Sequence, residues 1–154
     1  MFLSIDDTVR LRERWRADGR RVAFTNGCFD LLHPGHLSLL EAARAAGDAL
    51  IVAINSDASV REIKGPTRPV IPQDERAEVL LGLDAVDAVV VYDEPTPQRI
   101  IDALVPDVLV KGADWALDQI VGRETVEAAG GRVVRVPLVE GRSTSSILER
   151  IRKP

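Results

Sequence analysis

A chain of 154 residues is long enough to bury one hydrophobic core and too short to bury two comfortably. Its formal net charge of −4 argues against bulk binding of nucleic acid, for which a basic surface supplies most of the affinity. The apolar runs are strand-sized, far below the roughly 18 residues that a membrane-spanning helix needs, and the N-terminus lacks a secretory signal. A single cysteine excludes an internal disulfide and suits a reducing cytoplasm. We therefore expect one cytoplasmic domain over residues 1–154, with neither a membrane nor a nucleic acid as partner.

Five short apolar segments, rich in Val and Ile, recur along the chain. Such nearly continuous apolar runs are typical of strands that are buried on both faces of a parallel sheet. The predicted strands are residues 21–25, 49–55, 88–92, 107–111 and 132–137.

Helical patterns precede, separate and follow these strands. We expect an N-terminal helical extension over residues 1–20, a helix that contains Leu37, Leu40 and Ala43, and further helices at 72–83, 96–104, 121–129 and 143–153. Strands alternating with helices predict a Rossmann-like α/β fold, a doubly wound parallel sheet of about five strands in a single domain. The polar segment 56–71, punctuated by Pro and Gly, is expected to be a long functional loop.

The chain's only two histidines, His33 and His36, flank a Pro-Gly pair directly after the first predicted strand. Ligands of open α/β sheets bind beyond the carboxyl ends of the strands, which is where this segment lies. Pro34 suits the first position of a helix, with His33 as its N-cap, and Gly35 removes a side chain where a ligand must approach. The free N–H groups and dipole of this helix start predict an anion site within reach of both imidazoles.

Other interpretations of this segment remain open. Two histidines three residues apart also fit a partial metal site or a coincidental surface pair, although the chain offers no cluster of further ligands. Cys28 is either a nucleophile beside a histidine or a small packing residue. Neither G-x-x-x-x-G-K-[ST] nor G-x-G-x-x-G occurs, which disfavours a P-loop ATPase and a dehydrogenase.

A run of hydroxyl side chains, residues 143–146, precedes the last predicted helix. Ser146 and Glu149 have the spacing of a capping box, so capping explains part of the run. Four consecutive hydroxyls exceed what one cap requires. The run therefore predicts a second anion site at a helix start, suited to the outer phosphates of a nucleotide.

Two further loops place a lysine beside a glycine. "REIKGPTRPV" carries Lys64 and Arg68, and "LVKGADW" carries Lys111 and Asp114. A surface lysine is usually just solvated, but both of these lysines lie near the predicted anion sites.

The segment "NGCFDLLHPGH" resembles the H-x-G-H signature of the nucleotidylyltransferase superfamily, in its cytidylyltransferase-like branch. This resemblance implies that both histidines contact the α-phosphate of a nucleoside triphosphate. It also implies that the serine-rich helix start binds the outer phosphates, that Lys64 bridges the two substrates, and that the segment after Lys111 encloses the base. The glycerol phosphate cytidylyltransferases carry R-T-E-G-I-S-T-T where this chain reads "LVEGRSTS", so Leu138 replaces their arginine and Arg142 their isoleucine.

Roughly residues 20 to 152 resemble the heptose 1-phosphate adenylyltransferase half of bifunctional heptose kinase/adenylyltransferases, without the kinase half. The most discriminating stretch is "EPTPQRIIDALVPDVLVKGADW", in which the usual "VKGGDY" reads "VKGADW". The resemblance implies transfer of AMP from ATP to D-glycero-D-manno-heptose 1-phosphate, which makes ADP-heptose, a lipopolysaccharide precursor. The family also implies a homodimer.

The site residues that this resemblance implies fall into three groups. The catalytic residues are His33, His36 and Lys64. The nucleotide-binding residues are Thr25, Asn26, Gly27, Phe29, Asp30, Gly35, Lys111, Gly112, Asp114, Ser143, Thr144 and Ser145. The residues that bind the sugar phosphate are Asp57, Lys64, Arg68 and Arg76; for Arg76, which matches a recurring "ER" pair, a surface salt bridge is an equal alternative.

The predicted site residues include no obvious general base. This absence fits a phosphate monoester as the attacking group. Its second pKa lies near ~6, so it is already a dianion at neutral pH. The protein then has to supply positioning and charge neutralisation, helped by Mg²⁺ held by the phosphates rather than by side chains. Two alternatives stay open: a cytidylyl- or guanylyltransferase for another small phosphate ester, such as glycerol 3-phosphate or a different heptose 1-phosphate, and a non-catalytic module that senses ATP.

Overall fold

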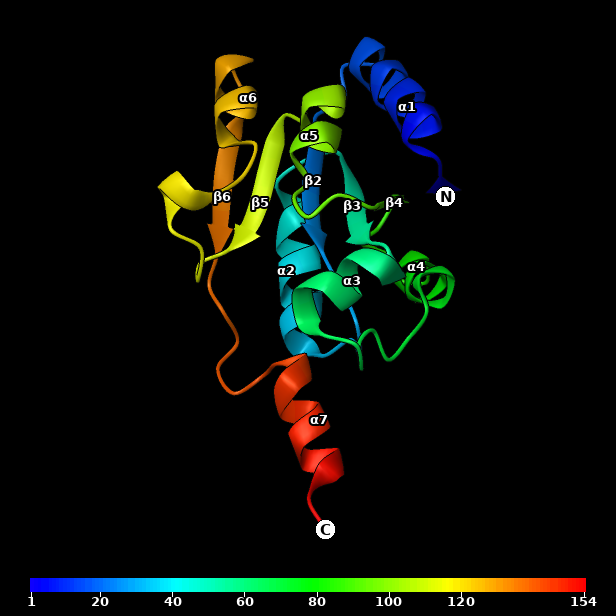
Figure 1. Ribbon diagram of the computed structural model, residues 1–154. Helices are drawn as coiled ribbons and strands as arrows, with labels where there is room; N and C mark the ends of the chain where they lie inside the picture. Colours follow the sequence, from blue (N-terminus) through cyan, green and yellow to red (C-terminus); the bar gives the residue numbers. More distant parts are fainter.

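Six parallel strands form one sheet in the order β1-β4-β3-β2-β5-β6 (Figure 1). The computed structural model describes residues 1–154. The α/β class and the five predicted strands are confirmed, and the sixth strand, β1, is a two-residue edge strand too short to leave a pattern in the sequence. The strands are β1 (Phe2–Leu3), β2 (Val22–Gly27), β3 (Ala49–Asn55), β4 (Ala88–Tyr92), β5 (Val108–Gly112) and β6 (Arg132–Val136).

Seven α-helices and one short 3₁₀ helix, η1 (Leu117–Gln119), connect the strands. The predicted loop 56–71 is partly wrong, because its first half is a helix, α3. Ser56 caps that helix by accepting a hydrogen bond from the backbone N–H of Ser59, and Gly65 ends it with a φ of 103°. The α-helices are α1 (Ile5–Ala17), α2 (Pro34–Ala45), α3 (Asp57–Lys64), α4 (Gln73–Leu81), α5 (Gln98–Leu104), α6 (Arg123–Ala128) and α7 (Thr144–Arg152).

Helices cover both faces of the sheet. Alternate residues of each strand face opposite sides, so Phe24 and Ile51 pack with α1, α5 and α6, while Leu50 and Val52 pack with α2 and α4. The N-terminal helix α1 belongs to the first of these layers. This arrangement is the doubly wound sheet that the sequence predicts.

The chain changes direction across the sheet at β2, which pairs with β3 on one side and with β5 on the other. The helix after β2 covers one face and the helix after β5 covers the opposite face. The connections therefore diverge and leave a crevice beyond the carboxyl ends of these strands. The last helix, α7, projects beyond the same end of the sheet and contains no buried residue (Figure 1).

None of the helices combines the length with the apolar character that a crossing of the bilayer requires.

Candidate active site

A cleft of about 800 Å³ lies at the carboxyl ends of the strands and reaches the start of α7. It brings together most of the predicted site residues from segments far apart in the chain. These are Asn26, Gly27, Phe29, Asp30, His33, Gly35, His36, Lys64, Arg68, Lys111, Gly112, Asp114, Ser143, Thr144 and Ser145.

The two histidines are locked into the first turn of α2. His33 is the N-cap and Pro34 the first helical residue, as predicted. The His33 Nδ1 accepts from the backbone N–H of Gly35 at 3.1 Å, and the His36 Nδ1 accepts from the backbone N–H of His33 at 3.2 Å. Because each Nδ1 is an acceptor, each neutral ring carries its proton on Nε2. Both rings therefore keep one N–H donor for a ligand.

The environment keeps both imidazoles neutral at pH 7. Burial, and then the charge of the neighbouring His33, lowers the pKa of His36 to about 4. Burial, and then the charge of Arg142, lowers the pKa of His33. The ring centroids are 3.9 Å apart, so two protonated rings would repel each other strongly. The free site thus presents two neutral donors, and a bound polyanion would favour their protonation.

The backbone beside the histidines is tightly constrained at Gly35 and at Phe29. A Cβ on Gly35 would lie 2.8 Å from Cε1 of His33, so only glycine fits beneath that ring. Phe29 adopts a left-handed conformation with a φ of 50°, and its ring lies 5.3 Å from that of His36. Strained backbone of this kind persists only where the surrounding packing holds it, and it is common at functional sites.

The start of α7 faces the same cleft. Ser143 and Ser146 form its capping box, so the predicted box of Ser146 with Glu149 is wrong by one turn. The Thr144 hydroxyl donates to the backbone carbonyls of Asp30 at 2.6 Å and Leu31 at 3.3 Å. Thr144 thereby attaches α7 to the loop that carries the histidines, and the two predicted anion sites become neighbours.

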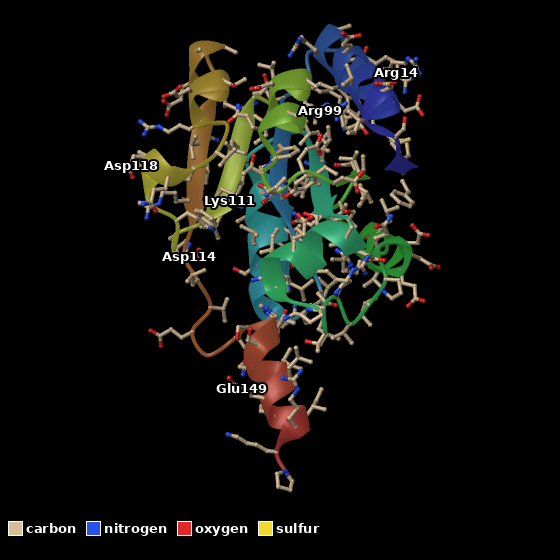
Figure 2. All side chains as sticks on the ribbon, in the orientation of Figure 1. Arg14, Arg99, Lys111, Asp114, Asp118 and Glu149 are labelled. Carbon is tan, nitrogen blue, oxygen red and sulfur yellow. The ribbon has the colours of Figure 1, made fainter.

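Four cationic side chains line the cleft, and three of them have no carboxylate partner. Lys64 ends α3 and is exposed, Lys111 is half-buried on β5, and Arg142 precedes α7; none of the three forms an ion pair. Figure 2 marks Lys111 on β5 and Asp114 just beyond it. The fourth, Arg68, is held by Asp30 at 2.8 Å. The free cations make the cleft suited to a phosphate-rich ligand.

The carboxylate of Asp30 anchors the loop on one side of the cleft. Its side chain is fully buried and accepts from Nε of Arg68 and from the backbone N–H groups of Val70 and Ile71. Burial alone would raise the pKa of Asp30, but these three donors lower it overall. Both oxygens are occupied, so this side chain positions the loop rather than offering its charge to a nucleotide.

Three predicted site residues lie outside the cleft lining. The Thr25 hydroxyl donates to the Val110 carbonyl and links β2 to β5. Arg76 is 2% exposed, and its guanidinium donates to Asp57 and to the backbone carbonyls of Cys28, Asn55 and Ile71. The structure therefore does not bring Thr25, Asp57 or Arg76 to the ligand space. Arg76 instead connects the start of α3 to the segment before the histidines, through its bonds to Asp57 and to the Cys28 carbonyl.

Sequence reasoning missed two buried polar residues of the cleft. Asn55 and Tyr92 end β3 and β4, are each 3% exposed, and line the cleft floor. Polar side chains at the last position of otherwise apolar strands are the signal that could have found them. Hydrogen bonds join the Tyr92 hydroxyl to Asn55 Oδ1 and to Asn26 Nδ2, each at 3.1 Å.

No group of three or more His, Cys, Asp or Glu side chains is placed to hold a metal ion.

Comparisons with known proteins identify the family of this chain. A family model described as cytidylyltransferase-like matches residues 24–150, from β2 into α7. The protein therefore belongs to the cytidylyltransferase-like family, as the histidine motif predicts.

Curated relatives narrow the resemblance within that family. The chain is 56% identical over 144 residues to the bifunctional protein HldE of Koribacter versatilis, covering 94% of this chain and 30% of that protein. It is 57% identical over 138 residues to the HldE of Geobacter sulfurreducens, covering 90% and 28%. The chain thus spans less than a third of the length of these relatives.

Solved structures share the fold. A lipopolysaccharide core biosynthesis protein from Thermoplasma volcanium is similar with a TM-score of 0.65 and 24% identity, over 80% of this chain and 100% of that one. A pantoate-beta-alanine ligase from Francisella tularensis has a TM-score of 0.68 and 17% identity, over 97% and 72%. At this level of identity the likeness concerns the fold alone.

Proposed function

We propose that this protein transfers AMP from ATP to D-glycero-D-manno-heptose 1-phosphate and releases ADP-heptose and pyrophosphate. The observation that carries the proposal is the pair of neutral histidines at the start of α2, facing a cleft that also receives a hydroxyl-rich helix start and three unpaired cations. The family match and the HldE relatives above 50% identity support the same reaction.

We divide the cleft into a nucleotide side and an acceptor side, with β2 and the histidines at the start of α2 between them. We assign ATP to the side formed by β5 and α7, where Lys111, Arg142 and the serine-rich turn gather. We assign the sugar phosphate to the side formed by β3, β4 and α3, where Lys64 and Arg68 lie.

The reaction needs positioning more than proton transfer. An oxygen of the sugar phosphate attacks the α-phosphorus, and the bond from that phosphorus to the oxygen bridging the α- and β-phosphates breaks. The electron pair of that bond leaves with pyrophosphate. His33 and His36 donate through Nε2 to the α-phosphate oxygens as charge builds there, and Lys64 holds the two phosphates together. The dianionic monoester needs no general base at neutral pH.

Departure of pyrophosphate requires charge neutralisation at the outer phosphates. The backbone N–H groups and hydroxyls at the start of α7 supply donors, and Arg142 supplies a positive charge beside His33. Mg²⁺, held by the triphosphate oxygens, would add further neutralisation when bound. Arg142 in this way replaces the arginine that glycerol phosphate cytidylyltransferases carry at the position of Leu138.

One experiment tests the proposal against its nearest rivals. Purified protein is incubated with Mg²⁺, each of ATP, CTP and GTP, and each of heptose 1-phosphate and glycerol 3-phosphate, and pyrophosphate release is followed. We expect release with ATP and heptose 1-phosphate at a rate well above every other pair. Release with CTP and glycerol 3-phosphate instead would assign the protein to the cytidylyltransferase reaction, and no release with any pair would refute the proposal.

The working form of the enzyme is also part of the proposal. The family resemblance supports a homodimer, and the single cysteine, Cys28, suits the reducing cytoplasm. Light scattering coupled to size-exclusion chromatography measures the mass in solution, and a particle of one chain would contradict the dimer.

A further inference from the structure

A chain of hydrogen bonds runs beneath the cleft from the nucleotide side to the acceptor side. It starts at Lys111 on β5, whose Nζ donates to Oδ1 of Asn26 at 3.3 Å and to the Asn26 carbonyl at 3.4 Å. Asn26 Nδ2 then donates to the Tyr92 hydroxyl, and that hydroxyl donates to Asn55 Oδ1. Asn55 Nδ2 donates to Ser59, whose hydroxyl ends the chain on the carbonyl of residue 94.

The two ends of this hydrogen-bond chain fix the donor-to-acceptor direction of every bond in it. A lysine ammonium can only donate, and a backbone carbonyl can only accept, so every hydrogen between them points the same way. Asn26 must turn its carbonyl oxygen to Lys111 and its amide to Tyr92. Tyr92, Asn55 and Ser59 are each 3% exposed or less, so loss of a partner leaves a nearly buried polar group without its hydrogen bond.

The position of the Lys111 ammonium depends on these hydrogen bonds more than that of an ordinary surface lysine would. It forms no ion pair, and its Nζ lies over the face of Trp115, 5.3 Å from the ring centroid. Burial lowers the pKa of Lys111, although Asp114 opposes this shift. Asn26 uses two of the three ammonium donors and leaves one for a ligand.

We propose that the Tyr92 hydroxyl is a positioning group that acts through Asn26 to hold the Lys111 ammonium in place for the triphosphate. The proposal rests on the proposed function, because it takes the ligand beside Lys111 to be ATP. Tyr92 itself is assigned no contact with the nucleotide. Without its hydroxyl, the Asn26 amide loses its only acceptor and is free to turn away from Lys111.

The test is a double-mutant cycle on ATP binding, measured by calorimetry with Mg²⁺. Tyr92→Phe should weaken ATP binding on the order of tenfold, because the hydrogen bond from the Lys111 ammonium to the triphosphate is then lost or misplaced. In a Lys111→Met background the same substitution should weaken binding less than about twofold, because the group that it positions is gone. Equal losses in the two backgrounds would assign Tyr92 a merely structural role and overturn the proposal.

Thr8→Val is a matched control. It also removes a buried hydroxyl, one that donates to the Ser4 carbonyl on α1, away from the cleft. It should lower thermal stability about as much as Tyr92→Phe and leave ATP binding unchanged. Weakened ATP binding in Thr8→Val would show that loss of any buried hydroxyl suffices, and it would contradict a specific role for Tyr92.

A second measurement does not depend on the folding of Tyr92→Phe. Tyr92 is the only tyrosine of the chain, so biosynthetic incorporation of 3-fluorotyrosine gives a single fluorine resonance. This resonance should shift between the ligand-free wild type and Lys111→Met, and an unmoved resonance would overturn the proposal. Because calorimetry and fluorine spectroscopy need no turnover, a protein that binds ATP without releasing pyrophosphate would refute the proposed reaction and leave this test decisive.

Discussion

At the scale of single residues, the chemistry depends on where His36 keeps its proton. Its Nδ1 is engaged by the backbone N–H of His33, so in the proposed reaction Nε2–H is its only donor to the α-phosphate. Replacing His36 with Ala removes that donor where charge develops, and we expect pyrophosphate release to slow by roughly 10²–10³-fold. Calorimetric ATP affinity should change less than about threefold, because binding is spread over many groups.

His36→Gln provides the matched control, since its amide N–H can take the place of Nε2–H and should restore part of the rate. Comparable losses of affinity and rate in His36→Ala would instead indicate the ATP-sensing module, in which the histidine serves binding only.

Burial of His36 also makes the fold sensitive to acid. The unfolded chain takes up a proton on this residue near pH 6.5, whereas in the folded protein the pKa is about 4. The associated stability is complete above about pH 6.5 and is lost as the pH falls toward 4. Between pH 7 and 5, we expect His36→Gln to lose about 2 kcal/mol less free energy of unfolding than the wild type. Urea unfolding at both pH values measures this difference, and an identical pH dependence would contradict it.

Arg142 is an exposed cation that acts on the histidine pair, because its charge helps to lower the pKa of His33. Without an ion-pair partner, it is free to bind the outer phosphates. Arg142→Ala should lower kcat/KM for ATP by about 30-fold, and Arg142→Lys should recover part of it. Arg132→Ala, which removes an exposed arginine from β6, is the control and should leave kcat/KM unchanged. Equal values for Arg142→Ala and wild type would rule out the phosphate contact.

At the scale of elements, Asp30 holds the loop between α3 and α4 against the histidine segment. Asp30→Asn replaces a buried carboxylate that pairs with Arg68 and accepts from two backbone N–H groups. We expect it to lower the free energy of unfolding by about 3 kcal/mol, because Arg68 loses its buried partner. The KM for the sugar phosphate should rise more than the KM for ATP, since Arg68 lies on the acceptor side.

Arg99→Ala is the matched control for this ion pair. Arg99 reaches Glu94 at 2.7 Å, but its side chain is 74% exposed (Figure 2). Its loss should cost less than about 1 kcal/mol. A similar cost for the two variants, or an equal rise of both KM values in Asp30→Asn, would contradict the anchoring role.

The sequence predicts the helices, strands and ligand-facing motifs better than it predicts the tertiary contacts that hold the loops of the site, such as those of Asp30. Strand runs, Pro34 and the hydroxyl run carry local signals, and the structure places each at the expected strand or helix start, although the cap of α7 lies one turn earlier than predicted. The sequence predicts a loop where α3 lies, because this helix is short and polar and only the Ser56 cap marks it. The partners of Asp30 lie about 40 residues away, so its contacts arise from tertiary packing that no local pattern records.

At the scale of the whole molecule, the nucleotide side is assembled from two parts that share little surface. Helix α7 buries none of its residues, and Thr144 connects its start to the histidine loop through two hydrogen bonds. The anion sites of α2 and α7 therefore stay together through a polar contact rather than through a hydrophobic core. The relative position of the two helix starts thus depends on one of the least buried parts of the fold.

Thr144→Val tests this dependence because it keeps the size of the side chain and removes its donor. We expect amide hydrogen exchange to accelerate in α7 and in residues 28–36, and ATP affinity to fall about fivefold, while the midpoint of thermal unfolding moves less than about 2 °C. Thr125→Val, which removes an exposed hydroxyl bonded to Asp102 on the α5–α6 face, should change neither exchange nor affinity. Unaltered exchange in α7 of Thr144→Val would mean that something other than this threonine holds the two anion sites together.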